Sequence, residues 1–151
     1  MLRLSKKTLF AIEAVLDIAH HAAGEPVQSH EITRRQNIPR RYLEQALQYL
    51  VRHKILVGVR GPKGGYQLAR ERRRISVGEI VKIVQSMETG KCAAKEPSMS
   101  ELGRKVVHPL WMDLQGSIMS QLDDVSIDDL CSRANDLGIA SEGRKNLDFS
   151  I

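Results

Sequence analysis

Aromatic residues are scarce in this sequence: Phe, Trp and Tyr make up 4% of its 151 residues, whereas hydrophobic residues as a whole make up 42%. A core with so few rings must be built from aliphatic side chains, which favours helix packing in one globular domain with an appended element. The chain has only two cysteines, Cys92 and Cys131. Two cysteines cannot form a disulfide framework, so the sequence indicates a reducing, cytoplasmic environment.

Long apolar runs are also missing. No stretch approaches the roughly 20 residues of a membrane span, and Glu13 and Asp17 interrupt the apolar residues near the N-terminus, where a signal peptide needs a continuous apolar core. The sequence contains no nucleotide loop of the Gly-x-x-x-x-Gly-Lys type, no nucleophile elbow and no clustered pair of carboxylates. We therefore expect no membrane partner and no enzymatic activity.

Positive charge is concentrated in one half of the chain. Residues 1–75 hold 15 Lys and Arg against 6 Asp and Glu, whereas residues 76–151 hold 8 against 12. A basic half joined to an acidic half favours a nucleic-acid-binding part and a separate part for assembly or sensing.

The stretch from Arg40 to Leu50 predicts an amphipathic helix. Its apolar residues recur at positions i, i+3, i+4 and i+7, namely Leu43, Ala46, Leu47 and Leu50. This spacing leaves the polar residues of the stretch on the outward side, namely Arg40, Arg41, Glu44, Gln45 and Gln48.

A basic hairpin is predicted directly after this helix. Two short runs with apolar residues, at positions 55–59 and 66–68, flank the loop Arg60-Gly61-Pro62-Lys63-Gly64-Gly65. Short strands joined by a loop rich in Gly and Pro are typical of a β-hairpin. A polar helix followed by a basic hairpin is the layout of a winged helix-turn-helix, in which the helix enters the major groove of double-stranded DNA.

The remaining helices are placed by their caps and apolar spacing. We expect a first helix over Lys6–Ala22, capped by Ser5, whose buried stripe is Leu9, Ile12, Leu16 and Ala19. A second runs from Ser29, as its N-cap, to Gln36, and Pro39 fits the first position of the next helix. Capping boxes at Ser76–Glu79 and Ser126–Asp129 each open another helix, the first ending near Met87, and positions 91–101 read as a loop.

Candidate DNA contacts follow from side-chain chemistry. Arginine pairs with guanine and glutamine with adenine in a bidentate manner, and glutamate accepts from cytosine while repelling phosphate. The predicted contacts on the recognition helix are Arg40, Arg41, Tyr42, Glu44 and Gln45. Those in the wing are Arg60, Gly61, Lys63 and Gly64, with Lys6 and Ser29 added as contacts outside both elements.

A long apolar helix is predicted from Pro109 to about Leu122. Its apolar face comprises Leu110, Trp111, Leu114, Ile118 and Leu122. A helix this apolar, placed after a complete small domain, is a candidate dimer interface, with packing inside one subunit as the alternative. Two half-sites in DNA are bound by two copies of a DNA-binding domain, which favours a homodimer and a palindromic operator.

The N-terminal Leu4-Ser5-Lys6, the helix residues Tyr42-Leu43-Glu44-Gln45, the wing Arg60–Tyr66 and the block Ser76–Ile80 together resemble one family. This is the Rrf-two family of bacterial winged-helix regulators. The resemblance spans roughly residues 1–135 and implies a homodimer, swapped or crossed through the C-terminal helix, that binds a palindromic operator. Many members hold an iron–sulfur cluster through three cysteines and sometimes a histidine, followed by a tryptophan.

Two of the cluster cysteines are absent from this chain. Cys92 occupies the first cysteine position, and His108 with Trp111 matches the His-x-x-Trp ending. Clusters are held mainly by thiolates, so we expect no resident cofactor, although one Cys and one His from each of two chains would formally supply four ligands. Cys92 as a lone thiol switch, alone or with Cys131, and an effector that uses neither, are the other hypotheses; His108 could equally cap a helix.

The prediction is thus a mainly α-helical fold with a small β-hairpin, a winged helix-turn-helix over residues 1–88. A sensor-type loop (89–108), a dimerisation helix with a short C-terminal helix (109–136) and a flexible tail (137–151) follow. The predicted function is a homodimeric, sequence-specific transcriptional repressor. An adaptor that binds another regulator or enzyme, with little specific DNA affinity, is the alternative from another class.

Overall fold

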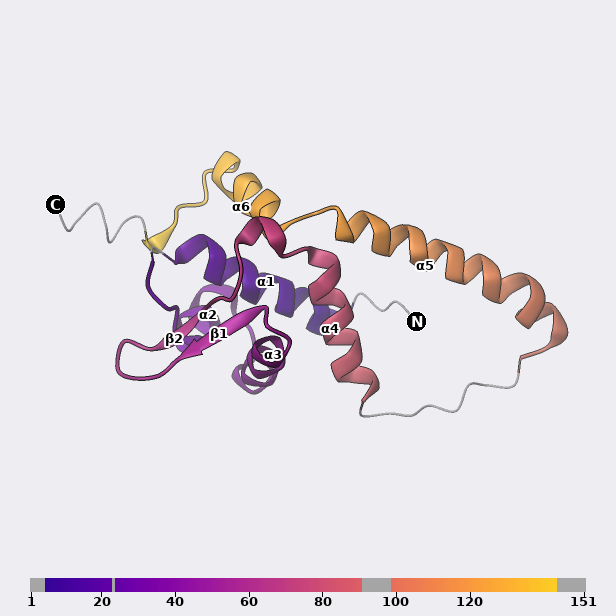
Figure 1. The fold of residues 1–151 in the computed structure, drawn as a ribbon, viewed down its shortest axis with the longest axis horizontal. Coiled ribbons are helices and arrows are strands. Elements are labelled where there is room, and N and C mark those ends of the chain that lie inside the picture. Colours follow the sequence, from indigo (N-terminus) through magenta and orange to yellow (C-terminus); the bar gives the residue numbers. More distant parts are fainter. Residues whose placement is uncertain (1–4, 23, 91–98, 144–151) are drawn as a thin grey trace.

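The computed structural model describes residues 5–22, 24–90 and 99–143. Its elements in chain order are α1 (Lys6–His21), α2 (Ser29–Gln36), α3 (Arg40–Arg52), β1 (Leu56–Val59), β2 (Gly65–Leu68), the 3-10 helix η1 (Arg72–Arg74), α4 (Val77–Thr89), the π-helix η2 (Gly103–Val107), α5 (His108–Asp123) and α6 (Ile127–Asp136). The fold is mainly helical with one antiparallel hairpin, as the sequence predicts (Figure 1).

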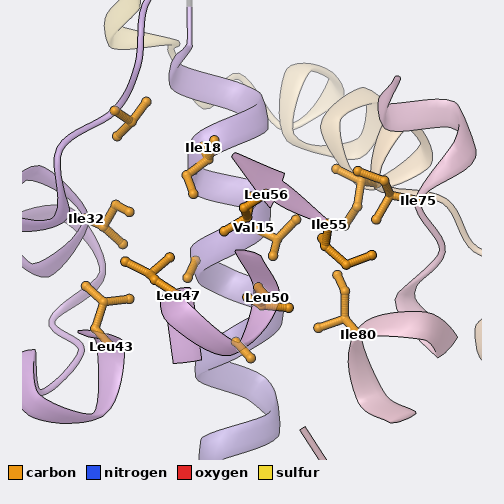
Figure 2. Close-up of a cluster of buried hydrophobic side chains, with 14 of the residues drawn as sticks. Val15, Ile18, Ile32, Leu43, Leu47, Leu50, Ile55, Leu56, Ile75 and Ile80 are labelled. Carbon is orange, nitrogen blue, oxygen red and sulfur yellow. The ribbon is translucent and has the colours of Figure 1, made fainter. Parts of the chain in front are cut away.

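Helix α1 is the centre of the core. Helices α2, α3, α4 and α6 and the hairpin all contact it, and Val15 and Ile18 lie among aliphatic side chains from the other elements (Figure 2). Leu43, Ala46, Leu47 and Leu50 are all buried, which confirms the predicted stripe of α3. Each fully buried aliphatic side chain contributes about 1.5–3 kcal/mol, and this core fixes the direction in which the other face of α3 points.

The predicted stripe of α1 was wrong by a rotation of the helix. The buried residues are Thr8, Ala11, Ala14, Val15, Asp17, Ile18 and His20. Leu9 is 48% exposed, while Ile12, Leu16 and Ala19 are only partly buried against the core. The apolar period alone misplaced the face because Asp17 and His20 are buried through polar contacts made far away in the sequence.

Two helix starts also differ from the prediction. Gln28, not Ser29, is the N-cap of α2, and its backbone N–H donates to the Glu31 carboxylate at 2.9 Å. Pro39 precedes α3 in the cap position rather than opening the helix. Between the two helices, Asn37 adopts the left-handed conformation (φ 53°) and donates its N–H to the Thr33 carbonyl, which turns the chain sharply into α3.

The hairpin pairs Leu56 with Leu68 and Val59 with Gly65. A third segment extends it, because Val27 and Tyr66 exchange both backbone hydrogen bonds, at 2.9 and 2.8 Å. The connection between α1 and α2 therefore holds the base of the hairpin beside the helix-turn-helix.

A continuous helical segment begins at Glu101, inside the region predicted as a sensor-type loop. Its first part is the π-helix η2, closed by a hydrogen bond from the His108 N–H to the Gly103 carbonyl. Pro109 lacks an N–H and its ring would clash with the carbonyl four residues earlier, which accounts for the wider turn at this place. His108 closes η2 and is the first residue of α5, whose N-cap is Val107, so His108 does not cap α5.

Helix α5 projects from the body like an arm, and none of its residues is buried (Figure 1). Its C-terminal end contacts α4, where Gly78 permits the approach: a Cβ at Gly78 would lie 1.9 Å from Asp123 Oδ1. The chain then returns through α6, whose predicted capping box is confirmed by reciprocal bonds between Ser126 and Asp129, at 2.9 and 3.1 Å.

Ser76 caps α4 as predicted, accepting from the Glu79 N–H at 3.1 Å, but the Glu79 carboxylate bonds to Arg70 instead of returning to the cap. Helix α4 also continues to Thr89, two residues past the predicted end. Residues 139–143 lie within the predicted flexible tail, and Ile139 and Glu142 among them contact α1 and α2. Across the described ranges, no helix has the length and apolar character needed to cross a bilayer.

Candidate nucleic-acid interface

The outward face of α3 carries the predicted recognition residues. Arg40, Arg41, Glu44, Gln45 and Gln48 are all exposed, on the face opposite the buried stripe. A helix that presents guanidinium, carboxylate and amide groups in one row is suited to reading base edges in a major groove.

Arg40 and Glu44 form an ion pair along this face. The Arg40 Nε donates to Glu44 Oε1 at 3.0 Å, and both side chains are largely exposed. Such a pair is worth only a few tenths of a kcal/mol in water, so either side chain can exchange it for a base or a phosphate. The pair keeps the Arg40 guanidinium close to the helix in the absence of DNA.

Tyr42 is placed differently from its neighbours. Its ring packs against Phe10 with centroids 6.1 Å apart, and its hydroxyl donates to the Lys7 carbonyl at 2.5 Å. Burial raises the pKa of Tyr42. This side chain joins α3 to α1, so it positions the recognition helix and the backbone of Lys7 rather than standing free on the outward face.

The start of α1 lies next to the recognition helix. A surface hollow is lined by Lys6, Lys7, Tyr42 and Gln45, among others. Lys6 and Lys7 are exposed. They follow the N-cap Ser5, whose side chain accepts from the Thr8 N–H. The structure thus brings the predicted contacts Lys6 and Gln45 together, whereas Ser29 is half-buried at the start of α2, with its carbonyl accepting from the Thr33 hydroxyl.

The wing is an exposed basic loop whose shape depends on glycine. Arg60, Gly61, Pro62 and Lys63 are all exposed. Gly61 has a φ of +109°, and a Cβ on Gly64 would lie 2.2 Å from the Val59 carbonyl oxygen. Only glycine fits so close to a neighbouring backbone. The glycines at the loop tip therefore determine the turn on which Arg60 and Lys63 are exposed.

The base of the wing is held by residues that the sequence analysis did not single out. A Cβ on Gly65 would lie 2.5 Å from the Val27 carbonyl oxygen, which shows how closely the two backbones approach. Beside them the Gln28 side chain donates to the Pro62 carbonyl at 3.3 Å. These contacts connect residues more than thirty positions apart, and no local pattern in the sequence marks them.

Of the two candidate sensing residues, Cys92 and His108, the structure describes only His108. Cys92 lies outside the described residues. His108 is exposed at the start of α5, and no cluster of three or more His, Cys, Asp or Glu able to hold a metal occurs within the described part of the chain. Cys131 is buried on α6, as expected for a small apolar residue, and burial raises the pKa of its thiol.

A single chain therefore does not fit an iron–sulfur cluster. With Cys131 buried in the core, Cys92 is the one cysteine left to serve as a thiolate ligand. Clusters need thiolates for most of their ligands.

Four of the five predicted interface residues of α5 are exposed, and Leu122 is half-buried near the contact with α4. The exposed apolar surface extends backwards through Val106, Val107 and Leu102. Packing inside the same subunit, the alternative for this helix, occurs where its C-terminal end contacts α4. Along the helix no described residue is buried, and an exposed apolar surface of this extent is typical of an interaction site.

Helix, sharp turn, polar helix and basic hairpin, arranged around one aliphatic core, define a winged helix-turn-helix DNA-binding protein. The chain belongs to the Rrf2 family, described as iron-dependent transcriptional regulators, whose profile matches residues 4–133. This confirms the resemblance drawn from the motifs.

Individual relatives agree with the family assignment. The chain is 36% identical over 139 residues to the HTH-type transcriptional regulator IscR of Sodalis glossinidius, covering 91% of this chain and 84% of the relative. Identity is also 36%, over 140 residues, to IscR of Xenorhabdus nematophila, covering 92% and 85%. Among solved structures, T. potens IscR matches with a TM-score of 0.73 and 30% identity over 93% of each chain. CymR of B. subtilis shares the fold (TM-score 0.69, 24% identity, 88% of this chain and 98% of that one).

Proposed function

We propose that this protein is a homodimeric transcriptional repressor that binds a palindromic operator in double-stranded DNA. One observation carries the proposal: α3 and the hairpin contact each other (Figure 1), and the polar residues of α3 and the basic loop of the wing are both exposed. The relatives are named as HTH-type transcriptional regulators, which supports the same function.

In this proposal α3 enters the major groove. Arg40, Arg41 and Gln45 supply donors to base edges, and Glu44 penalises sequences that bring a phosphate or a base acceptor close to it. Tyr42 holds the helix at the correct depth through its contact with α1. The exposed Lys6 contacts phosphate at the groove edge, and the start of α2 at Ser29 faces the backbone of the duplex.

The wing makes the second contact. Arg60 probes the minor groove or a base edge, while Lys63 neutralises a phosphate. Gly61 and Gly64 let the backbone of the loop approach the duplex. Because Gln28 and Val27 fix the hairpin to the start of α2, the wing and α3 approach the DNA as one unit.

Arg60→Ala is expected to weaken binding to the preferred duplex by about 1–3 kcal/mol, the usual value of one good base contact. Lys63→Ala, the matched control on the same loop, should weaken binding to all duplexes equally and reduce the salt dependence by about one phosphate contact. Both are measured by fluorescence anisotropy, on a duplex selected by the protein from a random pool and on a scrambled duplex. If both variants lost the same affinity for both duplexes, Arg60 would not contribute to sequence-specific binding.

The same titrations separate the proposal from the adaptor alternative. A regulator that neutralises several phosphates loses affinity steeply as salt rises. Weak binding that is indifferent to both salt and sequence would favour the adaptor.

We propose that regulation, if it acts through chemistry of the protein itself, uses Cys92. Cys92→Ser is expected to remove any response of DNA binding to oxidant or iron while leaving basal affinity within about twofold, since Cys92 is absent from both proposed DNA-contact elements. Purification without oxygen, followed by absorbance and iron and sulfide assays, tests the cluster directly. A coloured protein with near-stoichiometric iron that persists in Cys92→Ser would contradict this assignment.

A further inference from the structure

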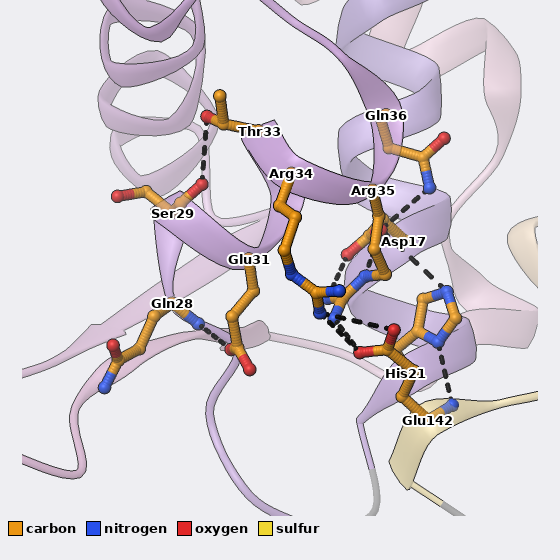
Figure 3. Close-up of polar contacts among 10 residues, drawn as sticks. All are labelled: Asp17, His21, Gln28, Ser29, Glu31, Thr33, Arg34, Arg35, Gln36 and Glu142. Atoms are coloured by element: carbon orange, nitrogen blue, oxygen red, sulfur yellow. Dashed lines mark hydrogen bonds and ion pairs between the residues drawn. The ribbon is translucent and has the colours of Figure 1, made fainter.

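Residues 139–143, called here the C-terminal strap, return from α6 to the helix-turn-helix. The Glu142 carboxylate accepts from Arg35 at 2.7 Å and from Arg34 at 2.9 Å, both in the last turn of α2 (Figure 3). Two histidines at the end of α1 hold the strap backbone: His20 Nε2 contacts the Ile139 carbonyl at 2.9 Å, and the Glu142 N–H donates to His21 Nδ1 at 3.0 Å. The strap therefore joins α1 to α2 from outside.

A buried ion pair lies beneath the strap. The Asp17 carboxylate, 0% exposed, accepts two bonds from Arg35, at 2.9 and 2.8 Å, and one from Gln36 at 2.8 Å. These bonds hold the last turn of α2 on α1 (Figure 3). Asn37 follows directly and turns the chain into α3, so the position of this last turn sets the position of the recognition helix.

The hydrogen bonds at His21 require its neutral form. Nδ1 accepts from the Glu142 N–H, so the ring proton must be on Nε2, which lies 3.9 Å from Asp17 Oδ2. A second proton would go to Nδ1 and remove the acceptor. His20, in contrast, contacts the Ile139 carbonyl through Nε2, so this contact needs a ring donor and not an acceptor.

We infer that the C-terminal strap is a pH-sensitive positioning element for DNA reading: it fixes α2, and so α3, while His21 is neutral, and it is released when His21 takes up a proton. Glu142 and His21 are positioning residues in this device, since neither lies on α3 or the wing. The effect on DNA binding depends on the DNA-binding function proposed above, whereas release of the strap itself does not.

Burial, the largest influence on the pKa of His21, acts in this direction, while the surrounding charges are divided between the two directions. Burial lowers the pKa of His21; Asp17 opposes that shift, Arg35 and His20 add to it, and Glu142 opposes it. A histidine whose pKa is lower when the strap is docked stabilises docking fully above its free pKa of about 6.5. Docking is then lost as the pH falls below that value, by up to about tenfold per pH unit for one proton.

Hydrogen–deuterium exchange of the strap, measured on the full chain without DNA at pH 7.5 and 5.5 and corrected for intrinsic rates, tests the release. Wild-type protein is expected to lose strap protection by up to about tenfold at the lower pH. His21→Gln retains a neutral acceptor that does not titrate and should show equal protection at both values. A wild-type strap with the same corrected protection at both pH values would overturn the inference.

Glu142→Gln provides the second variant, with Glu79→Gln as its matched control. Glu142 and Glu79 are 40% and 39% exposed and both pair with arginine at 2.7 Å, so the two variants remove the same charge from similar surroundings. Glu142→Gln is expected to lose strap protection at both pH values and to bind the selected duplex about fivefold more weakly, at the low end of usual coupling. Glu79→Gln should change neither.

The readouts separate the possible failures. Lost strap protection with unchanged affinity for the selected duplex would overturn the positioning role. A protein that binds no duplex under any condition would contradict the proposed function, and the exchange data would still decide whether the strap is released by protonation. Equal effects of Glu142→Gln and Glu79→Gln would mean that the loss of a negative charge, and not the contact of Glu142 with α2, causes the change. That result would overturn the assignment of Glu142 as a positioning residue.

Discussion

Arg35→Met is expected to lower the free energy of unfolding by about 3–5 kcal/mol, the usual cost of leaving one member of a buried ion pair without its partner. Methionine keeps most of the stem of Arg35, so the loss comes mainly from the Asp17 carboxylate, which is 0% exposed and would retain only its weaker donors. Urea unfolding followed by far-UV circular dichroism, at one fixed protein concentration, measures it.

Arg34→Met serves as the matched control. Arg34 is the preceding residue of α2 and bonds to the same Glu142, but its side chain is 62% exposed, so we expect a loss of less than about 1 kcal/mol. Replacing both members of the buried pair, as Asp17→Leu with Arg35→Met, should recover most of the loss, since an apolar pair leaves no charge unpartnered. Similar losses for the Arg34 and Arg35 variants would contradict the assigned burial.

The buried Asp17–Arg35 pair also explains why the buried face of α1 could not be predicted from the sequence. The stripe of α3 could be predicted because its apolar period and its polar face are local properties, and they agree with each other. The face of α1 could not, because Asp17 interrupts its apolar pattern and its partner Arg35 is eighteen positions away. Asp17 is one of two acidic residues among the apolar ones of α1, and no local pattern indicates that Asp17 rather than Glu13 is buried.

In the wing and the tail, too, features set by local sequence could be predicted, whereas features held by long-range contacts could not. The tip of the wing was predictable since Gly61 and Gly64 encode its turn. Its base is held by Val27 and Gln28 through long-range contacts that have no local signature. Residues 139–143 are rich in small and polar side chains, which usually indicates a loose end, yet their backbone is held by histidines of α1.

The exposed apolar side of helix α5 is the feature of the fold that favours assembly with a second copy of the chain. Its exposed apolar residues include Leu110, Leu114 and Ile118, which recur every four positions along one side of the arm. Within the described residues no side chain of α5 is buried, and the helix extends away from the other helices (Figure 1). Hydrophobic burial is the main favourable term in association, so a second copy of α5 is the partner that a symmetric dimer would supply.

Leu114→Glu is therefore expected to convert the proposed dimer to a monomer and to weaken binding to the selected duplex by about 10²-fold or more, since two linked DNA-binding units gain roughly 10²–10⁴ in affinity over one. A carboxylate in the middle of an apolar interface would be buried without a partner. Analytical ultracentrifugation measures the assembly and fluorescence anisotropy the affinity. Ser120→Glu adds the same charge at an exposed polar position of the same helix, six residues from Leu114 and turned away from the apolar side, and should leave both unchanged. A Leu114→Glu protein that stays dimeric and binds its operator normally would show that α5 is not the surface that joins the two readers.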